Sequence, residues 1–250
     1  MAQYIFLLIA GLLAGAMNAA AGGGSFITFP ALVYAGVPPI QANASSTVAL
    51  FPASLTSAWE FKEYIRPFAG VSLTAMVLLT LAGGFTGALL LLYTPSGSFN
   101  HFVPWLLLTG SLAFAFGKHA GDWLRERIKI GSGVILAGQF LLGIYGGYFG
   151  GAVGIMMMAV WALFGLSGIK TINANKTLFV GIANATAVLL FVIAGKVFWI
   201  ETCILMSATV TGGYFGALYT RRIDPATLRT GIVIFNFIIT AVFFMRAYLV

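Results

Sequence analysis

The sequence predicts an all-α membrane protein, a polytopic helical bundle of two inverted repeats with about eight full spans and two short glycine-broken segments. The 250-residue chain is 60% hydrophobic and only 8% charged, whereas soluble domains carry about 25% charge. The first charged residue is Glu60, and a second stretch without charge covers 67–117. Runs of this length are typical of a bilayer. The third observation is that the two halves share a polar and glycine-rich pattern.

The segments follow from the apolar runs between Gly, Pro, Asn and charged residues. They lie near 3–20, 24–36, 43–59, 68–93, 101–118, 132–149, 154–167, 174–195, 198–220 and 230–249. A hydrocarbon core of about 30 Å needs about 20 residues of helix. The second and seventh segments are shorter than this, and each begins in a glycine-rich stretch. We therefore expect eight to ten membrane segments, with these two broken.

The duplication rests on three matches at nearly one spacing. They pair 41–47 with 171–177, 82–89 with 211–218, and 20–25 with 150–155. Three collinear matches predict an internal repeat. Because each half holds an odd number of segments, the second half crosses upside down, as in many secondary transporters. The predicted units are a first repeat over 1–120, a cytoplasmic basic linker over 121–131 and a second repeat over 132–250.

The charges predict the orientation. Thirteen Lys and Arg against six Asp and Glu give a net charge of +7, but the basic residues form short islands rather than one face, so we expect no nucleic-acid partner. With the N-terminus outside, the cytoplasmic islands are 60–66, 118–129, 170–176 and 221–229. Only Lys196 and Arg246 fall outside. The sequence thus predicts periplasmic termini and a multi-pass protein surrounded by lipid.

Residue types needed for catalysis are scarce. Cys203 is the only cysteine, and all acidic residues lie in or beside the loops. No nucleophile–base or metal-ligand set is present, so we expect no enzyme activity, no cofactor and no metal site. Acid-based proton or sodium coupling is also disfavoured, because it usually needs a carboxylate within the membrane.

The first candidate site consists of the two glycine-rich breaks. Its residues are Gly22, Gly23, Gly24 and Ser25 in one half and Gly150, Gly151 and Gly154 in the other. A break at membrane depth persists only where protein or a cavity satisfies its peptide groups. The half-helix after each break would aim N–H groups and the positive end of its dipole at the centre, which favours an anion. Helix packing is the alternative, and we favour it for the GxxxG pairs beginning at Gly11, Gly83, Gly143 and Gly212.

The second candidate site consists of matched polar residues where the third and eighth segments begin. They are Asn43, Ser45, Ser46 and Thr47 in one half and Asn173, Asn175, Lys176 and Thr177 in the other. A lysine in a first helical turn opposes the helix dipole, and an anionic ligand would remove the conflict. The alternatives are N-capping by Asn43 and Asn173 and a snorkelling Lys176. Further along, Asn184 matches Ser54, and either can join helices.

A glycine-rich break followed by a helix beginning Ala-Ser-Ser-Thr, repeated with Ala-Asn-Lys-Thr, resembles the TauE/SafE family of membrane transporters over essentially the whole chain. The resemblance implies a bacterial inner-membrane permease for small sulfur-containing anions such as sulfite, sulfoacetate or other organosulfonates. Ala152 and Val153 replace two glycines of the first break, so the two breaks need not act equally.

The favoured function is export of such an anion by alternating access between the repeats. Moving one negative charge out of an inside-negative cell releases ~2.3 kcal/mol per 100 mV, so export needs little coupling. A passive anion channel and a non-transporting membrane subunit are the alternatives. The expected partners are the small anion and membrane lipids, and a homodimer is possible.

Overall fold

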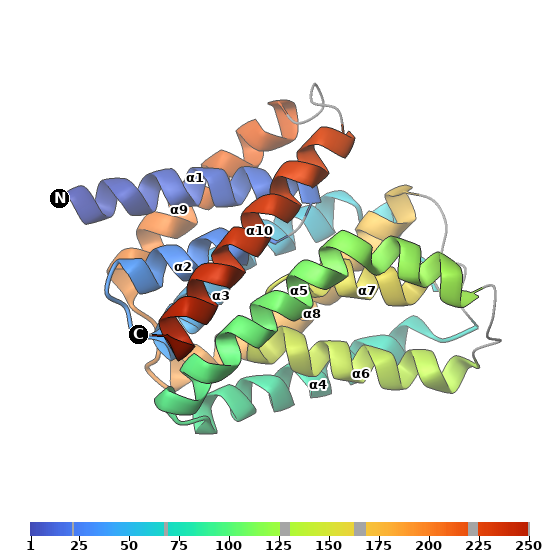
Figure 1. The fold of residues 1–250 in the computed structure, drawn as a ribbon. Coiled ribbons are helices and arrows are strands. Elements are labelled where there is room, and N and C mark those ends of the chain that lie inside the picture. The colour runs from blue at the N-terminus through green and yellow to red at the C-terminus, as the bar shows by residue number, and fades with distance from the viewer. Residues whose placement is uncertain (22, 68–69, 126–130, 163–168, 220–224, 250) are drawn as a thin grey trace.

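The fold is entirely helical in the part of the chain that the structure describes. The computed structural model describes residues 1–249 apart from 22, 68–69, 126–130, 163–168 and 220–224. Its helices, drawn in Figure 1, are α1 (Ala2–Ala21), α2 (Ser25–Tyr34), α3 (Pro39–Glu60), the short 3-10 helix η1 (Lys62–Tyr64), α4 (Leu73–Tyr93), α5 (Ser96–Arg125), α6 (Ser132–Tyr148), α7 (Val153–Ala162), α8 (Ile169–Ile193), α9 (Trp199–Tyr219) and α10 (Pro225–Tyr248). The predicted all-α class is confirmed.

Within the described residues, five helices are long and apolar enough to cross a membrane. These candidate spans are Ala2–Ala19, Leu73–Tyr93, Ser96–Phe116, Thr171–Ile193 and Thr230–Tyr248. The expected short segments appear as α2 and α7, each of 10 residues. At 1.5 Å per residue α2 extends about 15 Å, half of a hydrocarbon core, and the described part of α7 has the same length. The total of eight full spans stays a prediction.

Two helix pairs pack at glycine surfaces, α1 against α9 and α4 against α6. A Cβ added at Gly147 would overlap the carbonyl oxygen of Gly84, and one added at Gly15 would overlap that of Thr209. An added Cβ would likewise overlap a carbonyl oxygen at Gly83, Gly87 and Gly212, and it would lie 2.6 Å from Ala208 Cβ at Gly11 and 3.1 Å from Gly83 Cα at Gly143. Small residues let the backbones meet directly. The predicted packing role of these glycines is confirmed.

A buried polar chain joins α4, α6 and α7. Gln139 donates from Nε2 to Thr80 Oγ1 at 2.8 Å, and the indole N–H of Trp161 donates to Gln139 Oε1 at 3.0 Å. Gln139, Thr80 and Trp161 are all fully buried. Polar side chains at membrane depth need such partners, so this chain holds α7 against the α4–α6 pair.

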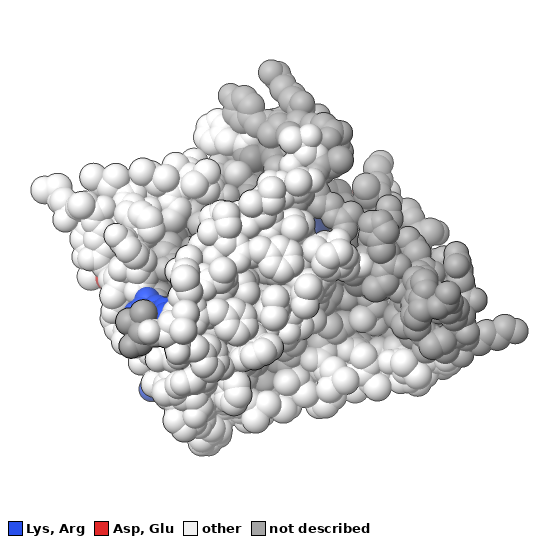
Figure 2. All heavy atoms as spheres, viewed as in Figure 1, with Lys and Arg blue, Asp and Glu red and all other residues white. Residues whose placement is uncertain are grey.

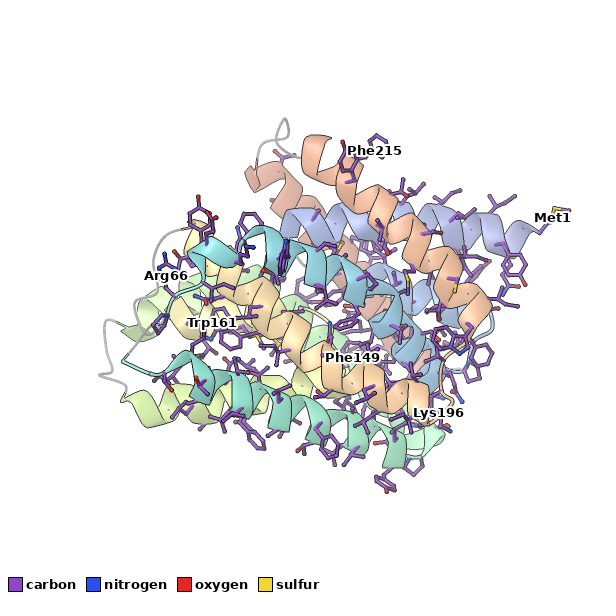
Figure 3. All side chains as sticks on the ribbon, turned by 180° about the vertical axis from the view of Figure 1, so that it is seen from behind. Met1, Arg66, Phe149, Trp161, Lys196 and Phe215 are labelled. Atoms are coloured by element: carbon purple, nitrogen blue, oxygen red, sulfur yellow. The ribbon has the colours of Figure 1, made fainter. Side chains whose placement is uncertain are left out.

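The chain termini and two basic residues distinguish the two ends of the bundle. The N- and C-termini lie at one end, which also carries Lys196, and Arg66 lies at the opposite end (Figures 1 and 3). The described part of the face that α5 and α10 present in Figure 2 is almost entirely white, with blue atoms toward the end that holds the C-terminus and one small blue area near the middle. Helix α5 continues to Arg125, into the predicted linker over 121–131. The division into two repeats and a linker stays a prediction.

The expected helix starts at Asn43 and Asn173 are wrong. Helix α3 begins at Pro39 and α8 at Ile169, so each Asn is the fifth residue of its helix. Proline is well suited to a first helical position because its fixed φ matches the helix and its missing N–H costs nothing there. Neither Asn is therefore an N-cap. Lys176 is the eighth residue of α8, so the predicted conflict with the first turn of the helix dipole does not arise.

Candidate functional site

The first break lies between α1, which ends at Ala21, and α2, which begins at Ser25. Gly23 has φ +132°, which glycine adopts without steric cost. The side chain of Asn18 supports the turn, because its Oδ1 accepts the N–H of Gly23 at 3.3 Å and of Gly24 at 3.5 Å. A side-chain carbonyl thus satisfies peptide groups that the broken helix leaves unpaired.

The second break lies between Tyr148, the last residue of α6, and Val153, the first of α7. Gly150 has φ +76°, and Ala152 has φ +58° although it carries a Cβ. A non-glycine residue in this left-handed region costs about 1–2 kcal/mol. The replacement of glycine by Ala152 therefore stores strain at this break, whereas the described residues of the first break reach positive φ only at a glycine.

The two breaks meet in the interior. Phe29 of α2 packs edge-on against Phe149 of the second break, with ring centroids 5.5 Å apart. Ser25 and Gly154, near the starts of the two short helices, line the same cavity of about 460 Å³. Segments separated by some 130 residues in the sequence thus line the same cavity.

The cavity brings together seven of the predicted site residues. These are Gly23, Ser25, Gly150, Gly154, Asn173, Lys176 and Thr177. The rest of the lining comes largely from α1, α3, α8 and α9 and includes Asn18, Ser54, Asn184, Thr209 and Tyr214. It also reaches Thr56 and Phe61, at the end of α3 that leads to Arg66.

Lys176 is the only charged side chain among the described residues of the lining. Its stem contacts the second break, because a Cβ added at Gly154 would lie 3.0 Å from Lys176 Cγ. Glycine at this position makes room for the lysine stem. Next to it, the Thr177 hydroxyl donates to the Asn173 backbone carbonyl at 3.0 Å, and Asn173 itself lines the cavity.

The matching residues of the first half are packed away from the cavity. Asn43 donates from Nδ2 to the carbonyl oxygen of Tyr148 at 2.8 Å, and Ser45 Oγ accepts the N–H of Phe198 at 2.9 Å. Ser46 Oγ lies 2.6 Å from the Thr28 hydroxyl, and Thr47 donates to the Asn43 carbonyl at 2.9 Å. All four polar side chains of this motif are buried.

The remaining predicted site residues also lie outside the lining. Gly24 packs α2 on α1, since an added Cβ would lie 2.8 Å from the Ala14 carbonyl oxygen, and Gly151 is covered by the Phe149 ring. Asn175 donates from Nδ2 to the Arg66 carbonyl at 3.1 Å. Gly22 lies outside the described residues.

A protein-family model described as sulfite exporter TauE/SafE matches residues 7–243. The chain belongs to this family. The predicted resemblance is confirmed, and with it membership of a family of membrane transporters.

The curated relatives carry transporter names. One is the probable membrane transporter protein YfcA of Escherichia coli (strain K12), 27% identical over 94% of this chain and 87% of that protein. Another, from Haemophilus influenzae, is a probable membrane transporter protein 28% identical over 94% of this chain and 92% of its own length. A third, probable membrane transporter protein ORF9 of a Sinorhizobium species, is 29% identical over 86% of this chain and 82% of its own. No solved structure matches the chain.

Several polar cavity residues of this TauE/SafE protein were missing from the predicted site, among them Asn18, Ser54 and Asn184. Asn18 is a polar residue near the end of an apolar helix, four residues before the first glycine run. Asn184 and Ser54 both line the cavity, and the sequence offered helix joining as their role. Polarity inside an apolar segment was the available signal, because such residues usually face a bundle interior or a cavity.

The chemistry of the TauE/SafE cavity lining is compatible with an anionic ligand. Its lining offers one cation, several amides and hydroxyls, and no carboxylate among its described residues. The described residues also contain no group of three His, Cys, Asp or Glu side chains able to hold a metal. This arrangement supplies hydrogen-bond donors and positive charge, but no nucleophile paired with a base.

Proposed function

We propose that this TauE/SafE protein exports small sulfur-containing anions, such as sulfite, sulfoacetate or other organosulfonates, through the bacterial inner membrane, without chemical change. The observation that carries the proposal is the single charged side chain in the described lining of the cavity, the ammonium group of Lys176. No ion pair joins Lys176 to another described residue. A cation at such a site favours an anionic occupant.

The energetics support an anion at this position. Moving an isolated ammonium from water into a low-dielectric medium is costly unless a partner neutralises it. Lys176 is surrounded by uncharged lining residues, both nearby in the sequence and across the second break: Gly154, Asn173, Thr177 and Val180. A bound anion would supply the missing charge, and the amides and hydroxyls would share its oxygens through charge-assisted hydrogen bonds.

We infer that the two halves are inverted repeats. The helix contacts support this. When each helix is replaced by the helix five places later or earlier in the chain, one contacting pair becomes another contacting pair. Helix α1 packs on α9 as α6 packs on α4, and α3 contacts α9 as α8 contacts α4. Helix α3 contacts α8 directly, and α5 contacts α10, which is the arrangement expected of elements beside a two-fold axis.

We further infer alternating access. The same polar motif has two environments: Asn43 is bonded to the carbonyl of Tyr148, whereas Asn173 faces the cavity. Asn18 occupies the position that matches Tyr148 in the other half. In the opposite state, Asn173 would donate to the Asn18 carbonyl and Asn43 would be released into a cavity open to the other side.

The charge distribution supports an inward-facing state with periplasmic termini. The cavity lining extends to Phe61 beside the basic turn that carries Lys62 and Arg66, and basic loops favour the cytoplasmic side. Anion release to the outside would then be driven by the membrane potential, at ~2.3 kcal/mol per negative charge per 100 mV. No carboxylate is needed for this driving force.

The proposal is tested by thermal unfolding of the detergent-purified protein with sulfite, sulfate, thiosulfate and small sulfonates. A ligand that binds the native state at 100 times its Kd adds about 2.7 kcal/mol of stability. A concentration-dependent rise with a sulfur oxyanion or sulfonate supports an anion site, and the absence of any rise contradicts it. Unitary currents in bilayers would favour a passive channel, and folded protein without ligand or flux would favour a non-transporting subunit. Native mass spectrometry tests the predicted homodimer.

A further inference from the structure

The Asn184 carboxamide stands out among the polar groups of the cavity. It belongs to α8, lies in the cavity lining and is 7% exposed. Its Oδ1 is buried and has no hydrogen-bond partner in the described part of the chain. A buried carbonyl without a donor costs about 1–3 kcal/mol, so native proteins rarely leave one unpaired without a reason.

Two neighbouring polar side chains of the lining are already engaged in hydrogen bonds. Asn18 Oδ1 accepts the N–H groups of the first break, and the Ser54 hydroxyl donates to the Leu50 carbonyl at 3.4 Å. Lys176 carries N–H donors only. The cavity thus combines the N–H donors of the lysine with a buried acceptor that has no partner, Asn184 Oδ1, eight residues further along the same helix.

We propose that Asn184 is a specificity-determining residue and that the cavity takes an oxyanion or sulfonate that also carries an O–H or N–H donor. The inference rests on the proposed anion transport and specifies the substrate class. The anionic group would be held by the donors of the cavity, while the O–H or N–H of the same molecule donates to Asn184 Oδ1. The cavity of about 460 Å³ has room for several atoms beyond an anionic head.

The chemistry of this pairing is discriminating. A site with a buried acceptor rejects an isostere that lacks the donor, because the acceptor then loses its water without gaining a partner. Hydroxy- or amino-sulfonates and hydrogen-bearing oxyanions satisfy the requirement, whereas simple alkyl sulfonates do not.

Isethionate and 1-propanesulfonate provide the test, because both are permanent monoanions with the same number of non-hydrogen atoms. Their affinities are measured by isothermal titration calorimetry on the purified full-length protein. We expect the wild type to bind isethionate about tenfold more tightly. In Asn184→Leu, which keeps the branched shape and the number of non-hydrogen atoms but removes the acceptor, the ratio should fall below about twofold. Asn184→Ala replaces this variant if it does not fold.

Thr186→Val is the matched control. Thr186 lies two residues along α8, outside the lining, and donates to the Ala183 carbonyl at 3.1 Å. It should keep the wild-type ratio. Equal wild-type affinities for the two sulfonates, or a preference that survives in both Asn184 variants, would overturn the role of Asn184 but leave anion binding intact. Absence of binding of either sulfonate and of sulfite would instead contradict the proposed function, and this inference with it.

Discussion

Replacing Gly147 by alanine should destabilise the bundle although it improves helix propensity. The ideal Cβ at Gly147 overlaps the Gly84 carbonyl oxygen and lies only 2.8 Å from Gly84 Cα, whereas ordinary contacts are 3.4 Å or longer. These are backbone atoms, so no side-chain rotation relieves the overlap. Helices α4 and α6 must separate by roughly 0.6–1 Å, a gap that forfeits a quarter to a half of the dispersion energy of each contact pair.

Gly133→Ala on the same helix is the control. No atom lies within 4 Å of its ideal Cβ, so alanine there should be neutral or stabilising by up to about 1 kcal/mol. Overpacking typically costs about 1–3 kcal/mol, and about 2 kcal/mol corresponds to a Tm lowered by about 6 °C. Thermal unfolding followed by tryptophan fluorescence in detergent measures both variants. Equal Tm values for Gly147→Ala and Gly133→Ala would refute the close-packing argument.

Two further predictions concern the second break and the end of the bundle that carries Lys196, which is closed in the proposed inward-facing state. Ala152→Gly should leave the free energy of unfolding unchanged or raise it by up to about 1 kcal/mol, because φ at this residue is +58°. Ala152→Val should lower it, because a β-branched residue fits this region poorly. A lower Tm for Ala152→Gly in thermal unfolding would show that no strain is stored there. Asn43→Ala removes the 2.8 Å hydrogen bond to the Tyr148 carbonyl, worth about 1 kcal/mol, and should raise the population open at the Lys196 end about fivefold. The rate at which a membrane-impermeant thiol reagent labels Thr28→Cys in a Cys203→Ser background measures this population, and an unchanged rate would count against alternating access.

Local signals predicted the breaks and the packing glycines well. Consecutive glycines before a short apolar run have few structural outcomes at membrane depth, and the structure places Gly23 and Gly150 at positive φ as a break requires. A GxxxG spacing likewise puts both glycines on one face of a helix, so the contact surfaces at Gly15 and Gly147 follow from the spacing.

The environment of the matched polar motifs was not predictable from the sequence. Asn43 and Asn173 have the same local sequence position, yet one is bonded to a distant carbonyl and the other faces the cavity. Sequence repeats define a shared local structure, whereas the tertiary arrangement decides which copy is exposed. The helix starts were missed for a different reason. The polar residues suggested caps, but α3 already begins at Pro39, four residues before Asn43.

The most direct test is counterflow of labelled sulfite or isethionate in proteoliposomes, comparing wild type with Lys176→Met and Lys196→Met. Both substitutions remove one lysine, but only Lys176 lines the cavity. The account predicts saturable counterflow in the wild type, at least a tenfold loss in Lys176→Met, and wild-type flux in Lys196→Met. Wild-type flux in the Lys176 variant, or no flux in folded wild-type protein, would contradict an anion path through this cavity.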